Sequence, residues 1–118
     1  MNGVFLRFYV TEFSQHRGRL VYEWLIEQAY RRGIGGCSVF RAIAGYGRHG
    51  EVHEESFFDL AAELPLEVCF VLSEAQAAEL LAALRDEGLD LFYVQHPATY
   101  GRVVSGKPRP VRAQPDEE

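Results

Sequence analysis

Residues 66–76, Leu-Glu-Val-Cys-Phe-Val-Leu-Ser-Glu-Ala-Gln, contain a strand and the beginning of a helix in one unbroken stretch. The run Leu66–Leu72 is almost continuously apolar, which is typical of a central strand. Ser73 and Gln76 have the spacing of a capping box, in which each side chain accepts a hydrogen bond from a free N–H at a helix start. We therefore expect a buried strand that leads directly into a helix ending at Gly88. The residues that this helix should bury are Ala77, Leu80, Leu81 and Leu84.

The N-terminal part of the chain has the same order of a strand and a helix. One face of residues 4–11 is wholly aliphatic or aromatic, because every second position is apolar: Val4, Leu6, Phe8 and Val10. From residue 19 to 32 the apolar positions follow the period of a helix, and those expected to face the sheet are Val21, Tyr22, Leu25, Ile26 and Ala29. Leu20 and Trp24 fall on the opposite side. The pattern predicts that they are exposed and contact a partner, or that a loop or the C-terminal tail covers them.

The remaining strands complete the fold prediction. We expect strands at residues 37–44 and 90–95, the second closed by Pro97, and a short strand-like arm at 57–60. The order strand, helix, strand, strand, helix, strand is the α+β, ferredoxin-like split βαβ pattern, an antiparallel sheet with two helices on one face. Because apolar residues occur at both parities of the strands, the other face needs a cover. We therefore expect a homotrimer with its sheets turned inward.

Length and composition limit the class of protein. The 118 residues fit one domain, with a ferredoxin-like part at 1–96 and a flexible tail at 97–118 that holds four of the five prolines. The net charge of −5 and the pI of about 5.4 argue against nucleic-acid binding. The sequence shows neither a secretory signal nor a long apolar segment, so we expect a cytoplasmic protein that is not membrane-embedded. Cys37 and Cys69 lack the spacing of a zinc site and should be reduced.

A glycine-rich run follows the second predicted strand, at Arg41-Ala-Ile-Ala-Gly-Tyr-Gly-Arg-His-Gly-Glu-Val-His53. Glycine admits positive φ and lets a ligand approach backbone N–H groups, and Arg48 adds a fixed positive charge beside them. Arg41 either binds the same anion or forms a salt bridge with a helix glutamate. The candidate residues for binding a small-molecule anion are Arg41, Gly45, Tyr46, Gly47, Arg48 and His49.

Two other functions remain open from the same residues. His49, Glu51 and His53 alternate along the chain, so two imidazoles and a carboxylate could bind Zn²⁺ or Cu²⁺, or they could simply belong to a solvated loop. The first reading would give a metal-binding or metal-tolerance protein. A small enzyme of unknown reaction is the third hypothesis. The sequence offers no support for covalent catalysis, because it lacks a G-x-S-x-G run and neither cysteine stands beside a base.

A family resemblance rests on four segments, at residues 16–23 (His-Arg-Gly-Arg-Leu-Val-Tyr-Glu), at 36–47 (Gly-Cys-Ser-Val-Phe-Arg-Ala-Ile-Ala-Gly-Tyr-Gly), at His53 and from Asp59-Leu60 through Leu64-Pro65. Over about residues 4–95 the chain resembles the uncharacterised P-II-like family known as domain of unknown function 190. The run at 45–50 is also similar to the base of the T-loop in P-II signalling proteins, where a Gly-Phe-Gly-Arg-Gln run contacts the phosphates of ATP or ADP between subunits.

The resemblance implies a trimer with lateral clefts, an adenine nucleotide as a possible ligand and no enzymatic activity. It also implies that residues 45–53 signal to a partner protein, which the sequence does not identify. P-II proteins carry a second glycine-rich, basic loop after their second helix. Here residues 85–91 read Arg-Asp-Glu-Gly-Leu-Asp-Leu, with three acids after the arginine and one glycine. The second half of a nucleotide site is therefore missing from its usual place.

Overall fold

The computed structural model describes residues 1–45 and 65–106. Within these residues a four-stranded antiparallel sheet has the strand order β4-β5-β1-β6. A separate two-stranded hairpin, β2-β3, precedes the first helix. The elements of the sheet and its helices are β1 (Asn2–Thr11), α1 (Val21–Arg31), β4 (Cys37–Arg41), β5 (Pro65–Leu72), α4 (Glu74–Asp86) and β6 (Phe92–Thr99). The hairpin consists of β2 (Gln15–His16) and β3 (Arg19–Leu20). The predicted ferredoxin-like order is confirmed.

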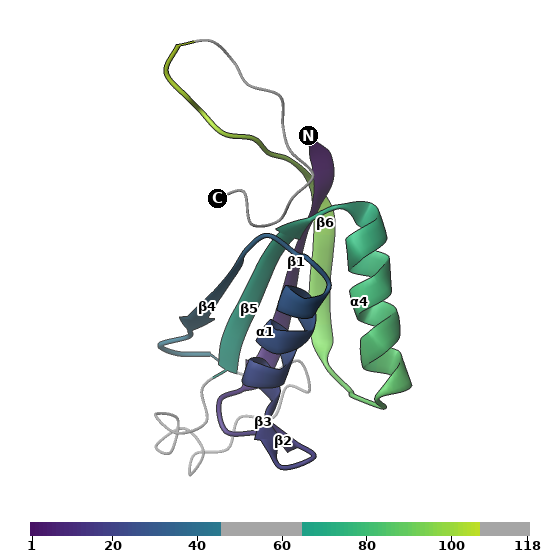
Figure 1. Cartoon of the computed structure of the whole chain (residues 1–118). Coiled ribbons are helices and arrows are strands. Elements are labelled where there is room, and N and C mark those ends of the chain that lie inside the picture. Colours follow the sequence, from purple (N-terminus) through teal and green to yellow (C-terminus); the bar gives the residue numbers. More distant parts are fainter. Residues whose placement is uncertain (46–64, 107–118) are drawn as a thin grey trace.

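Both helices pack against the same face of the sheet, and no helix of the described residues lies on the opposite face (Figure 1). The residues of β1 that point to the helices are the four predicted ones, each at most 4% exposed. In register with them on β5 lie Leu66, Val68, Phe70 and Leu72. The ring of Phe8 meets that of Phe70 edge-on, with centroids 6.1 Å apart. The core therefore lies between the central strands and the helices.

The capping box at the start of α4 is present as predicted. The backbone N–H of Gln76 donates to Ser73 Oγ at 3.0 Å, and the Ser73 N–H donates to Gln76 Oε1 at 3.1 Å. The Gln76 amide also donates to the Gly33 carbonyl at 3.2 Å, which ties the cap to the segment after α1. Ala77, Leu80 and Leu84 are buried as predicted, and Leu81 is partly buried.

Of the two readings of Trp24, contact with a partner or cover by a loop, the structure shows the second. Its side chain is only 8% exposed and belongs to the core, while Tyr22 and Ile26, which we expected to be buried, are partly exposed. The hairpin β2-β3 lies against this side of the helix, where the His16 ring meets the Trp24 ring edge-on at 5.6 Å. Leu20 is partly buried at the N-cap of α1. A segment that we read as a loop therefore covers this side.

The ends of two strands, β4 and β6, differ from the predicted ends. Strand β4 stops at Arg41 rather than at residue 44. Pro97 does not close β6, which continues to Thr99 with Pro97 opposite Val4. This is possible because β6 is an edge strand, where a missing N–H leaves no ladder bond unmade. The arm predicted at 57–60 lies outside the described residues, and the division of the chain at residue 96 stays a prediction.

The two cysteines lie on neighbouring strands but point to opposite sides of the sheet. Cys37 is in register with Phe70, and Cys69 is in register with Ser38, so the two thiols differ by one position in the pleat. Both are free. Desolvation and the neighbouring Cys69 raise the pKa of the Cys37 thiol to about 11, which leaves it protonated at neutral pH.

Candidate functional site

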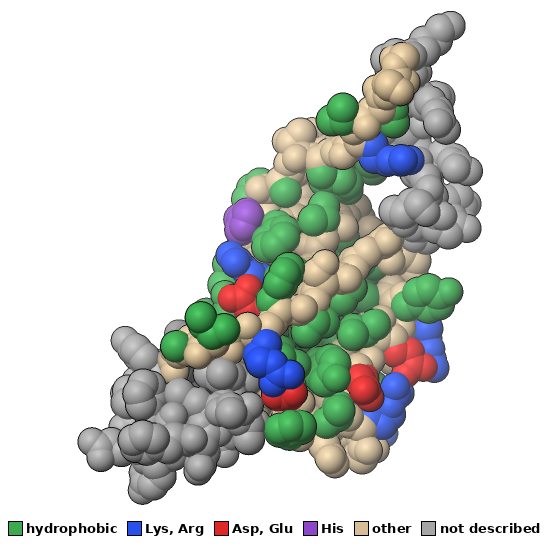
Figure 2. Space-filling model, turned by 90° about the vertical axis from the view of Figure 1, so that its left-hand side faces the viewer, with side chains coloured by type: hydrophobic (Ala, Val, Ile, Leu, Met, Phe, Trp, Pro, Cys, Tyr) green, Lys and Arg blue, Asp and Glu red, His purple; other side chains and the backbone are tan. Residues whose placement is uncertain are grey.

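Strand β4 is one edge of the sheet, no helix of the described residues covers it, and it leads to the predicted ligand residues. All five of its residues are exposed, because α1 and α4 lie over the other strands (Figure 1). Phe40 is 57% and Ile43 is 93% exposed. Seen from this edge, hydrophobic side chains cover much of the described surface, with basic and acidic groups between and beside them (Figure 2). The edge thus offers apolar surface beside the polar end of the strand.

Arg41 forms an ion pair at the end of β4. Its Nη1 donates to Oε1 of Glu12, which directly follows β1. The hydrogen bond and charge of Glu12 raise the pKa of Arg41 above its usual value. The Arg41 side chain is 51% exposed and that of Glu12 only 14%, so the carboxylate anchors the guanidinium from the protein side. A guanidinium has five N–H donors, and one acceptor leaves others for an anion in solvent.

Of the two readings of Arg41, the ion pair is therefore present, but with a residue of the turn after β1 rather than of a helix. The ion pair does not exclude that Arg41 also binds an anion, because the arginine remains half exposed. Glu12 was not among the predicted site residues. Its partner is 29 positions away, so no local pattern pointed to it.

The described chain stops soon after Arg41. Gly45 has a φ of 152°, a value that residues with a side chain rarely adopt, and an added Cβ would meet no atom of the described residues within 4 Å. A side chain at this position would therefore be disfavoured by the backbone rather than by crowding. The other predicted ligand residues, Tyr46, Gly47, Arg48 and His49, and the predicted metal ligands His49, Glu51 and His53, lie outside the described residues. Their roles stay predictions.

A second polar cluster joins the hairpin to the end of α4. His16 Nε2 lies 2.8 Å and Arg17 Nε lies 3.3 Å from the same oxygen, Oε1 of Glu87. Their hydrogen bond and charge lower the pKa of Glu87, with His16 as the larger cause. Arg17 and Gly18 have φ values of 55° and 80°, as in the two-residue turns favoured by β-hairpins. The cluster holds the hairpin in place over Trp24.

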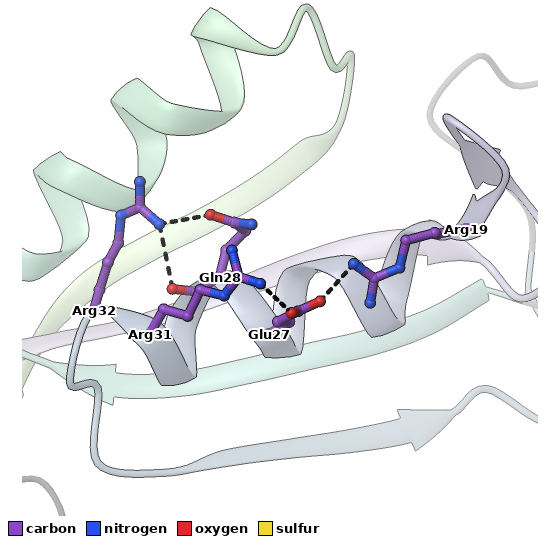
Figure 3. Close-up of polar contacts among 5 residues, drawn as sticks. All are labelled: Arg19, Glu27, Gln28, Arg31 and Arg32. Atoms are coloured by element: carbon purple, nitrogen blue, oxygen red, sulfur yellow. Dashed lines mark hydrogen bonds and ion pairs between the residues drawn. The ribbon is translucent and has the colours of Figure 1, made fainter.

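The outer surface of α1 carries a third network (Figure 3). Glu27 forms an ion pair with Arg19 through Oε1 and accepts a hydrogen bond from Arg31 through Oε2, both at 2.5 Å. Arg19 and then Arg31 lower the pKa of this carboxyl. Arg32 donates to the side-chain oxygen of Gln28 at 2.7 Å. These contacts link neighbouring turns of one helix and its N-terminal flank, so they stabilise α1 and need no ligand.

The segment after α4 is a short turn. The N–H of Gly88 donates to the Arg85 carbonyl at 2.9 Å, and that of Leu89 donates to the Leu84 carbonyl at 3.2 Å. Gly88 has a φ of 75°, which suits the glycine that commonly follows a helix. The chain then enters β6 at Phe92. The departure seen in the sequence at residues 85–91 is thus accompanied by a tight helix end.

Two negative findings apply to residues 1–45 and 65–106. In this part of the chain, His, Cys, Asp and Glu side chains form no group of three or more that could hold a metal ion. None of the helices described there is long and apolar enough to cross a membrane.

The fold of this chain is similar to the folds of solved P-II-like proteins. The structure is similar to CPII, a nitrogen regulatory PII-like protein from Thiomonas intermedia K12, bound to ADP, AMP and bicarbonate. The TM-score is 0.62 at 16% identity, covering 86% of this chain and 91% of that one. A protein from Thermus thermophilus described as a putative PII-like signaling protein gives a TM-score of 0.56 at 14% identity, over 83% and 87% of the two chains.

The family follows from the sequence match. Residues 3–94 match the DUF190 family, described as "Uncharacterized ACR", and the chain belongs to this family. A UPF0166 protein from Aquifex aeolicus (strain VF5) is 35% identical over 80 residues, which are 68% of this chain and 76% of the relative. The resemblance inferred from the sequence is therefore confirmed at the level of family and fold.

Proposed function

We propose that this protein is a small, non-enzymatic P-II-like sensor that binds an anionic small molecule and signals to a partner protein through residues 45–53. The observation that carries the proposal is Arg41, half exposed at the end of the uncovered strand β4 and anchored by Glu12. It stands four residues before Gly45, where the proposed ligand loop begins. A structural neighbour of the same fold class is a regulatory protein bound to ADP, AMP and bicarbonate, which supports both the role and the ligand class.

The proposed ligand is an adenine nucleotide or a smaller anion such as bicarbonate. Arg41 would donate to the anion with the N–H groups that Glu12 leaves free, and Arg48 would add a second charge. Gly45 and Gly47 would let the anion approach the backbone, while Tyr46 and His49 would line the same site. No observation favours the alternative in which His49, Glu51 and His53 bind a metal ion.

The proposed assembly is a cytoplasmic homotrimer in which the helix-free faces of the sheets turn inward. Large apolar side chains on this face remain open in the single chain, with Phe40 57%, Phe92 42% and Val71 40% exposed. Exposed apolar surface of this kind often marks a site of contact with another protein. Packing through these faces would bring each β4 edge next to a neighbouring subunit, so that the ligand site would lie in a cleft between subunits.

Calorimetric titration with AMP, ADP, ATP and bicarbonate tests the ligand proposal. Arg41→Ala should raise the dissociation constant about 10- to 150-fold, because the loss of a charge-assisted hydrogen bond costs about 1.5–3 kcal/mol. Gly47→Val should abolish binding by blocking the backbone approach. Arg31→Ala is the matched control, because Arg31 is similarly exposed and also pairs with a glutamate, but on the outer side of α1.

The outcomes separate the parts of the proposal. If the wild type binds none of the four compounds at millimolar concentration, the proposed ligand class is wrong. If binding occurs but Arg41→Ala and Arg31→Ala bind as tightly as the wild type, the site lies elsewhere on the protein. Amide hydrogen exchange of residues 45–53, measured with and without the bound compound, checks whether the loop takes part.

A further inference from the structure

The described part of the proposed anion site carries no net charge. Strands β1 and β4 both run antiparallel to β5, so they end at the same end of the sheet, and this brings Glu12 beside Arg41. The two side chains form an ion pair through Oε1 and Nη1. A free anion that approaches Arg41 therefore also meets a carboxylate. The repulsion from this carboxylate offsets much of the attraction of the guanidinium.

Glu12 is held in this place by its own turn. The Thr11 carbonyl accepts hydrogen bonds from the Ser14 N–H at 3.1 Å and from the Ser14 hydroxyl at 3.0 Å, which closes the turn that contains Glu12. The Glu12 side chain is only 14% exposed, against 51% for Arg41. We therefore expect the carboxylate to stay beside the guanidinium when a ligand binds.

The pair offers donors and acceptors side by side. Within residues 1–45 and 65–106, no side chain or backbone group other than Arg41 donates a hydrogen bond to Glu12. A carboxylate has about four acceptor positions and a guanidinium five N–H donors, so one hydrogen bond between them leaves capacity on both. A ligand that accepts from Arg41 and donates to Glu12 uses both groups. An anion without a hydrogen to donate can use only the first.

We infer that Glu12 determines the ligand class, and that the site takes an oxyanion that carries a hydroxyl donor. The charged oxygens accept from Arg41, and the hydroxyl donates to Glu12. The inference rests on the proposed function and narrows its ligand. Bicarbonate carries both groups on one carbon atom. In a nucleotide the phosphate supplies the charged oxygens and a ribose hydroxyl supplies the donor, as in other nucleotide sites where an acidic side chain binds the ribose.

Two pairs of matched compounds test the inference on the wild-type protein by calorimetric titration. Formate is bicarbonate with hydrogen in place of the hydroxyl, and dideoxy-AMP is AMP without its two ribose hydroxyls. In at least one pair, the compound with the hydroxyl should bind about 10- to 150-fold more tightly, because it makes one more hydrogen bond to a charged group. A preference within the first pair identifies the ligand as a free anion. A preference within the second pair identifies it as a nucleotide.

Glu12→Gln tests whether Glu12 is the acceptor. The variant keeps the size of the side chain and removes its charge, so formate should bind more tightly than it does to the wild type. The preference for the hydroxyl should shrink, because a hydrogen bond to a neutral acceptor is weaker than one to a carboxylate. Glu27→Gln is the matched control, because Glu27 also pairs with arginines but on the outer surface of α1. It should leave the preference unchanged.

The outcomes separate this inference from the proposed function. If the wild type binds none of the four compounds at millimolar concentration, the anion site itself is wrong and the inference fails with it. If both members of each pair bind equally tightly, anion binding stands and the role of Glu12 is overturned. A preference that Glu12→Gln retains in full also overturns it. Should circular dichroism show that Glu12→Gln does not fold, Glu12→Asp replaces it, since the shorter side chain withdraws the acceptor and should also reduce the preference.

Discussion

The two faces of the sheet are built from alternate residues of the same strands, yet they differ in kind. Toward the helices, Leu6, Phe8, Val68 and Phe70 are at most 1% exposed, and no buried residue among those described is polar or charged. On the opposite face, which we call the open face, aromatic and aliphatic side chains alternate with Arg7 and Glu67. The first face packs against the helices and forms the core. The second combines apolar surface with an Arg7–Glu67 ion pair that is about one-third exposed, which is the composition of a contact surface.

The largest effect is expected from a substitution in the core, on the face of the sheet toward the helices. Phe8→Ala should lower the free energy of unfolding by about 3–5 kcal/mol, because it leaves a cavity against Phe70. Phe5→Ala, on the open face, should cost clearly less in a dilute sample, because part of that ring already faces solvent. Urea unfolding of both variants measures the difference. Equal losses would mean that the open face contributes to the stability of a single chain as the core does.

A smaller effect is expected where the chain covers its own open face. Gly3 shares the parity of Phe5, and a Cβ added to it would lie 2.3 Å from the Leu72 carbonyl oxygen and 2.8 Å from a ring carbon of Tyr100. Gly3→Ala should therefore cost about 1–3 kcal/mol of stability. Gly101→Ala is the control, because a Cβ there meets no atom within 4 Å in the part of the chain that the structure describes. A thermal melt that shifts equally for both variants would contradict the close approach.

The helix cap gives the next effect. Ser73→Ala removes the acceptor for the Gln76 N–H and should cost about 1 kcal/mol. Ser38→Ala makes the same chemical change on the exposed strand β4, where the effect should stay within about 0.5 kcal/mol. Chemical denaturation of the two variants compares them directly. A loss for Ser38 as large as that for Ser73 would point to a role for the open-face serine in assembly.

The smallest effect concerns pH. His16 and Arg17 lower the pKa of Glu87 in the folded protein below its usual value of 4.5. The charged form is therefore favoured by folding, so its contribution is fully present above pH 4.5 and is lost as the pH falls through the lowered pKa. Glu87→Gln should remove this part of the acid sensitivity. Thermal melts between about pH 3 and 6 should converge for wild type and variant at the acid end, and a gap that widens there would refute the assignment.

Much of the fold follows from local patterns. The period-two strand at residues 4–11, the apolar strand at 66–72 and the capping box at Ser73 all depend on neighbours within a few positions, and the structure confirms them. Strand ends were less accurate. We predicted that Pro97 ends the last strand. Whether a proline ends a strand depends on whether the strand lies at the edge of the sheet, and only the order of the strands in space decides this.

The sequence by itself determined the order of the elements, which residues of β1 and β5 face the core, and where α4 starts. Each of these is set by short-range periodicity and hydrogen bonding. Only the tertiary structure decided the environment of Trp24, because the hairpin that covers it folds back over α1. The same holds for the Arg41–Glu12 pair, whose members are 29 positions apart. It also holds for the buried Nε of Arg7, which finds no acceptor among the described residues of the strands on either side of it. Contacts between distant segments depend on chain packing, which local patterns do not encode.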